Sequence, residues 1–69
     1  MLITQLHRKL FDKVKTHNEA GHYTIILKTN GEIIIAMNEL IELGVIKLIK
    51  KTKNKNYYDY IDGKLLPLK

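Results

Sequence analysis

The chain has 69 residues, enough for one small domain over residues 1–69 and too few for a two-lobed active-site cleft. Twelve Lys and Arg against seven Asp and Glu give a formal net charge of +5, which favours an anionic partner such as nucleic acid. The absence of cysteine excludes a disulfide framework and a thiolate metal site. Without such cross-links we expect a thin core and a homodimer.

The first predicted element is an amphipathic helix over residues 2–17. Apolar positions recur there at three- and four-residue steps, the spacing of one helix face, at Ile3, Leu6, Leu10, Phe11, Val14 and His17. The other side is mostly charged and includes Arg8 and Lys9. Residues 18–21 end the helix, with Gly21 as a candidate left-handed cap.

Residues 22–37 are compatible with two structures. In the first, strand-like runs over 22–28 and 32–36 flank Asn30-Gly31, the strongest short-range signal of a β-hairpin. In the second, Thr29 caps a helix and Glu32 completes a capping box. The helix then has apolar residues at helical spacing and ends at Gly44; these residues are Ile33, Ala36, Met37, Leu40 and Leu43.

The C-terminal third predicts a β-hairpin followed by an apolar tail. Strand-like runs over 45–52 and 57–61 are joined by the polar turn 53–56. Asp62-Gly63 then turns the chain into a tail that Pro67 restricts to an edge strand at best. The tail leucines are expected to dock on the core or on a neighbouring chain; they are Leu65, Leu66 and Leu68.

The positive charge is concentrated in the predicted hairpin. Its lysines, with no acidic residue among them, are Lys47, Lys50, Lys51, Lys53 and Lys55. They fit either a solvated strand edge that discourages aggregation or a ribbon that contacts phosphates. Tyr58 and Tyr60 share one face of the following strand and are candidates for stacking on bases.

Residues 29–61 resemble the third helix and wing of a winged helix-turn-helix domain. The resemblance rests on the stretch Ile33-x-x-Ala36-Met37-x-x-Leu40-x-x-Leu43-Gly44-Val45-Ile46-Lys47. It implies a small α+β domain with an N-terminal amphipathic helix, a second helix within 19–28, a central helix and a C-terminal β-hairpin wing. Asn30 and Asn38 would then face a DNA groove, although this helix has no Arg or Lys for phosphates or guanine edges.

A second resemblance is to the bacterial Sm-like RNA chaperones. It rests on a basic first helix followed by Thr24-Ile25-Ile26-Leu27-Lys28-Thr29-Asn30-Gly31 and a run of strands. It implies an N-terminal helix followed by a mostly antiparallel β-sheet, and an RNA-binding role.

The sequence offers no set of catalytic residues. The three histidines lack metal-ligand spacing, serine is absent and the glycines are isolated, so we expect no enzyme activity, metal or cofactor. The apolar runs are too short to cross a membrane and no secretory signal precedes them, which favours a cytoplasmic protein without a membrane partner.

We therefore expect a small nucleic-acid-binding protein, regulatory or accessory, that contacts phosphates through its hairpin lysines, with DNA favoured over RNA as its ligand. The alternative from another class is a protein-binding module, an inhibitor or adaptor. It would use an acidic helix and the apolar tail, through Glu39, Glu42, Leu65, Leu66 and Leu68. The third candidate is an Sm-like RNA-binding protein.

Overall fold

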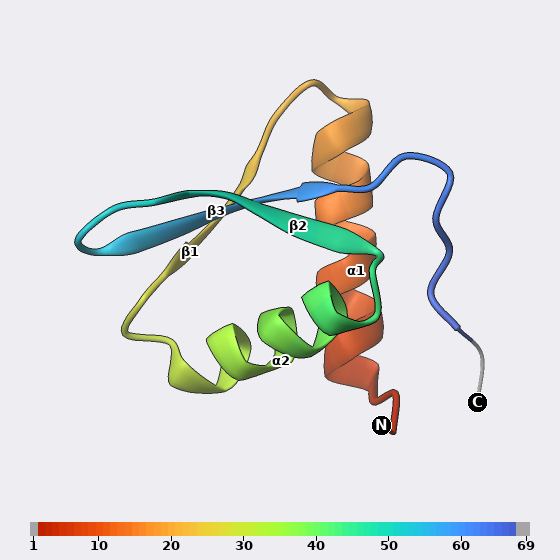
Figure 1. Cartoon of the computed structure of the whole chain (residues 1–69), viewed down its shortest axis with the longest axis horizontal. Helices are drawn as coiled ribbons and strands as arrows, with labels where there is room; N and C mark the ends of the chain where they lie inside the picture. Colours follow the sequence, from red (N-terminus) through yellow and green to blue (C-terminus); the bar gives the residue numbers. More distant parts are fainter. Residues whose placement is uncertain (1, 68–69) are drawn as a thin grey trace.

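The computed structural model describes residues 2–67, which form two helices and a three-stranded antiparallel sheet (Figure 1). The elements in chain order are α1 (Gln5–Glu19), β1 (Thr24–Leu27), α2 (Gly31–Glu42), β2 (Ile46–Lys51) and β3 (Lys55–Tyr60). This confirms the α+β class, with an N-terminal helix, a central helix and a C-terminal hairpin. The winged-helix assignment stays a prediction. Residues 19–28, expected to hold that family's second helix, contain the end of α1 and strand β1.

Helix α1 begins at Gln5, three residues later than predicted, because Thr4 caps it. The Thr4 hydroxyl accepts a hydrogen bond from the His7 backbone N–H at 3.3 Å, and His7 Nδ1 accepts one from the Thr4 N–H at 3.1 Å. This is a capping box in which histidine replaces the usual Glu or Gln. The helix ends as expected: Gly21 adopts φ 82°, which is the left-handed conformation of a helix C-terminus.

The middle of the chain combines one strand with one helix, and the hairpin predicted at Asn30-Gly31 is wrong. Strand β1 pairs with β3, not with residues 32–36. Gly31 begins α2 and is not among the glycines with positive φ, which a type I′ turn would require. The helix prevails because its periodicity buries Ala36, Met37 and Leu40 on one face.

The predicted capping box of α2 does not form. Asn30, not Thr29, is the N-cap residue, and it makes no side-chain capping hydrogen bond. The end of the helix agrees with the sequence prediction, because Gly44 follows the C-cap residue and adopts φ 79°.

The central strand of the sheet is β3, which pairs with β1 on one side and β2 on the other. The β2–β3 turn is closed by Thr52, whose N–H donates to the Lys55 carbonyl at 2.8 Å. Strand β3 therefore begins at Lys55, two residues before the predicted start. The pairing contains a β-bulge at Ile49, because Leu48 lies opposite Tyr58 and Lys50 lies opposite Tyr57.

Both helices pack on one face of the sheet. The core joins α1 and α2 to the inward side chains of the strands through Leu10, Phe11, Val14, Ile26, Ala36, Met37, Leu40, Val45, Ile46, Tyr58 and Tyr60. Phe11 and Tyr60 meet edge to face, with ring centroids 5.8 Å apart. The opposite face, which we call the outer face, is solvent-accessible and is formed by Tyr23, Ile25, Leu27, Lys47, Ile49, Lys50, Lys55, Tyr57 and Asp59.

The tail after β3 crosses α1 without forming a strand. Leu66 is half-buried against the core, as expected for a docked tail, whereas Leu65 is 73% exposed. Leu68 lies outside the described residues. No helix within residues 2–67 has both the length and the apolar character that a membrane crossing requires.

Candidate nucleic-acid interface

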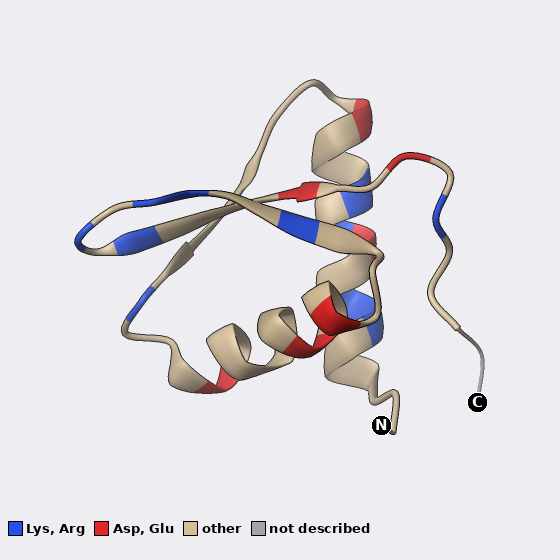
Figure 2. Cartoon of the chain, viewed as in Figure 1, with Lys and Arg blue, Asp and Glu red and all other residues tan. Residues whose placement is uncertain are grey.

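The hairpin of β2 and β3 presents its lysines to solvent. All five predicted positions are exposed: Lys47, Lys50, Lys51, Lys53 and Lys55. Within residues 2–67 the one close contact between an acidic and a basic side chain joins Glu39 to His7, so no carboxylate of that region pairs with a hairpin ammonium group. Figure 2 shows the resulting blue segments along the hairpin, whose tip extends away from α1. The hairpin therefore combines an extended shape with an excess of positive charge, five lysines against Asp59, which lies opposite Lys47.

The β-bulge at Ile49 determines which lysines share a face. Lys47 and Lys50 are three residues apart and would point to opposite sides of a regular strand. The extra residue brings both to the outer face, opposite Asp59 and Tyr57 respectively. Lys55 lies opposite Leu27 and joins them on that face. The bulge could not be predicted from the sequence, because it arises from the pairing of the two strands.

The tyrosines lie on the faces opposite to those expected. Tyr58 is fully buried and Tyr60 is 8% exposed, so neither ring can stack on a base, and both predictions are corrected here. Tyr57 instead points to the outer face, where the Lys50 ammonium lies 5.5 Å from its ring centroid. On the buried face of β3, Asn56 Nδ2 donates a hydrogen bond to the Tyr58 hydroxyl at 3.0 Å.

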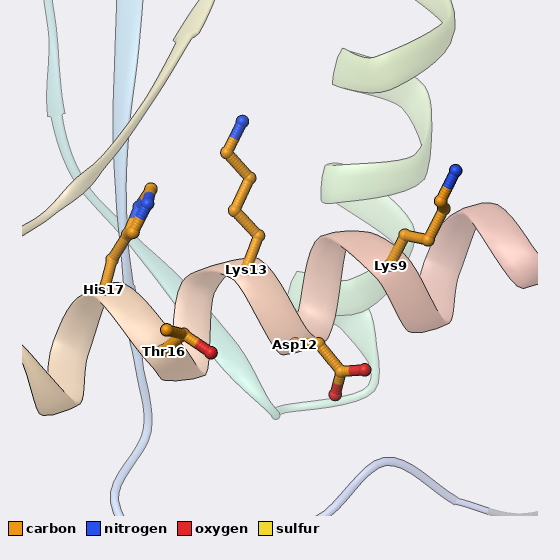
Figure 3. Close-up of a pocket in the computed structure, with 5 residues that line it drawn as sticks. All are labelled: Lys9, Asp12, Lys13, Thr16 and His17. Atoms are coloured by element: carbon orange, nitrogen blue, oxygen red, sulfur yellow. The ribbon is translucent and has the colours of Figure 1, made fainter.

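The basic residues of α1 form a second cationic surface. Lys9, Lys13 and His17 recur at four-residue steps and point to the same side of the helix, whereas Asp12 and Thr16 point to the other (Figure 3). Together these five residues line a shallow hollow. Arg8 is exposed beside the tail, where it lines a different hollow with Leu65 and Leu66. The structure thus separates Arg8 from Lys9.

Helix α2 does not supply positive charge. Asn30 and Asn38 are both exposed, and Asn38 shares the solvent side of the helix with Ile35 and Glu42. The only charged residues of α2 are acidic, as Figure 2 shows in red. A phosphate backbone would be repelled by this surface, so α2 lacks the cations on which groove reading by a helix usually depends.

Glu39 connects the two helices rather than facing a partner freely. Its Oε1 lies 2.7 Å from His7 Nε2, and the His7 side chain is 6% exposed. Sequence reasoning missed this contact, although His7 lies four residues after Ile3 and three before Leu10, on the apolar stripe of α1. Glu42 is exposed. Of the two acidic residues expected to form a protein-binding surface, Glu39 therefore contacts His7 within the chain and Glu42 faces solvent.

The described residues contain no group of three or more His, Asp or Glu side chains that could hold a metal ion. No protein-family model, curated protein or solved structure matches the chain. The function proposed for this protein therefore rests on its own geometry. The homodimer and the cytoplasmic location stay predictions.

Proposed function

We propose that the protein binds nucleic acid, without catalysing a reaction, through the Lys-rich hairpin of β2 and β3. The observation that supports the proposal is the set of exposed hairpin lysines, none of which forms an ion pair with a carboxylate of residues 2–67. Ammonium groups in this arrangement displace the counterions condensed on a phosphate backbone, and the released counterions drive binding. A regulatory or accessory role fits a domain of this size.

The proposal assigns different tasks to the charged elements. The hairpin contacts phosphates, and Lys9 of α1 adds positive potential that steers the anion toward the protein. The acidic surface of α2 lies apart from the hairpin tip and remains in solvent. Among the candidate functions, nucleic-acid binding is favoured over a protein-binding module because Glu39 and Leu66 are engaged inside the chain.

The test replaces Lys50, Lys53 and Lys55 with Gln and measures affinity for a labelled oligonucleotide by fluorescence anisotropy. The matched control replaces Lys13, Lys15 and Lys64, which removes the same formal charge from other surfaces. We expect the hairpin variant to bind about tenfold more weakly or worse, and the control to bind much more tightly than the hairpin variant. Equal losses in both variants would show that net charge alone matters and would contradict the assignment to the hairpin.

A further inference from the structure

The outer face of the sheet is apolar and aromatic at its centre. Ile25 and Leu27 of β1 are 48% and 47% exposed, and both alternate with the buried residues of the same strand. Tyr57 lies directly opposite Ile25 in the neighbouring strand. Neither helix covers these side chains, because the helices pack on the other face. A soluble domain of this size rarely exposes adjacent large apolar side chains without a role for them.

Two tyrosines on this face line one hollow. Tyr23, just before β1, and Tyr57 of β3 form it together with Ile49 and Lys50 of β2. Tyr23 is 59% exposed, and the ammonium of Lys50 lies over the Tyr57 ring. The hollow therefore offers two aromatic side chains, with a cation over the ring of Tyr57. The bulge at Ile49 creates this arrangement by turning Lys50 toward Tyr57.

The charge around the hollow favours an anionic occupant. Lys47 and Lys55 lie on the same face as Lys50. The acidic residue closest to them in the register is Asp59, opposite Lys47. Its Oδ1 already accepts hydrogen bonds from Asn18 Nδ2 at 2.7 Å and from the Tyr60 N–H at 2.8 Å. The face thus pairs stacking surfaces with phosphate-binding groups, whereas an apolar protein partner would have to leave these lysines unpaired.

We infer that the outer face binds single-stranded nucleic acid, with unpaired bases stacked on Tyr23 and Tyr57 and the adjoining phosphates held by Lys50 and its neighbours. The inference rests on the proposed function and specifies its ligand. Duplex is disfavoured because its bases stack on one another and offer only their edges. Stacking on tyrosine needs unpaired bases and tolerates any sequence.

The test compares two double variants, one without and one with the aromatic rings. Tyr23→Leu with Tyr57→Leu removes both rings, whereas Tyr23→Phe with Tyr57→Phe keeps them. Anisotropy is measured with oligothymidine of about 16 nucleotides and with a duplex of the same length. We expect the Leu variant to bind oligothymidine about tenfold more weakly or worse, the Phe variant to bind it like the wild type, and the affinity of both for duplex to be unchanged.

A second measurement needs no substitution. NMR of the wild-type protein follows the ring resonances of its four tyrosines while oligothymidine is added. Tyr23 and Tyr57 should shift, and the buried Tyr58 and Tyr60 serve as internal controls that should stay. Unmoved Tyr23 and Tyr57 resonances in the bound protein would overturn the inference even if the Leu variant fails to fold.

The outcomes separate this inference from the proposed function. If the Leu variant keeps full affinity for oligothymidine while the hairpin-lysine variant loses it, the stacking site is wrong and the proposed function stands. If the wild type binds duplex more tightly than oligothymidine, the stacking site is likewise wrong and the proposed function stands. If the wild type binds neither ligand, both proposals are wrong, and the outer face is then open to a protein partner.

Discussion

His7 shows how one side chain can fix both a helix start and a helix–helix contact. The Thr4 N–H can only donate, so His7 Nδ1, which accepts it, carries no proton. The proton of the neutral ring is then on Nε2, which donates to Glu39 Oε1. The same imidazole therefore caps α1 and binds α2.

This arrangement predicts that Glu39 stabilises the fold and that Glu42 does not. Glu39→Ala leaves the Nε2–H of His7 without its acceptor, which costs about 1 kcal/mol because water can partly replace a carboxylate that is 40% exposed. Thermal unfolding followed by circular dichroism should show a melting temperature about 4–8 °C lower than that of Glu42→Ala. The control lies on the same helix, so the gain in helix propensity is similar in both variants. Equal melting temperatures would contradict the contact.

Gly31 and Gly44 give a second prediction at the level of single residues. Gly31 lies in the first turn of α2, and a Cβ there would meet no atom within 4 Å. Gly31→Ala should therefore stabilise the protein by about 0.4–1 kcal/mol through the unfolded state. Gly44 has the same open surroundings but φ 79°, so Gly44→Ala should destabilise it by about 1 kcal/mol.

Denaturant unfolding of the two alanine variants checks this pair. The expected order of stability is Gly31→Ala above wild type and Gly44→Ala below it. A destabilised Gly31→Ala would indicate a left-handed residue at this position, as in the hairpin alternative, and would contradict the helix start.

At the scale of elements, the sequence predicted what depends on local periodicity. The first helix, the helix from the apolar stripe ending at Gly44, and the C-terminal hairpin all follow from patterns within one segment. The middle was ambiguous because residues 22–36 fit a hairpin around Asn30-Gly31, although a helix from residue 31 accounts for more of the apolar pattern. The choice between them is made by β3, more than twenty-five residues away in the chain, with which β1 pairs.

The faces of β3 illustrate the same limit. Alternation showed that Tyr58 and Tyr60 share one face, but not whether that face is the buried one. Asn56 also lies on the buried face, where its Nδ2 donates a hydrogen bond to the Tyr58 hydroxyl two residues away. The candidate site therefore shifted from Tyr58 and Tyr60 to Tyr57 and Tyr23, while the hairpin lysines remained exposed as predicted.

In the whole molecule, the two faces of the sheet differ in how they are covered, and the elements differ in the sign of their charge. Two helices bury one face of the sheet and leave the other open. Acidic side chains dominate α2, whereas the hairpin has an excess of lysines (Figure 2). A protein built in this way presents an extended cationic and aromatic surface on its hairpin, and its net charge of +5 understates the local potential there.

The most direct test of the central claim is the salt dependence of binding. We measure the affinity for oligothymidine between about 50 mM and about 200 mM salt. The two proteins compared are the wild type and the variant in which Gln replaces Lys50, Lys53 and Lys55. We predict a steep linear decline of log affinity with log salt for the wild type, and a slope shallower by about 2 for the variant, because each contacted phosphate contributes about 0.7 on a single strand. A wild-type affinity indifferent to salt, or identical slopes for the two proteins, would contradict phosphate binding by the hairpin.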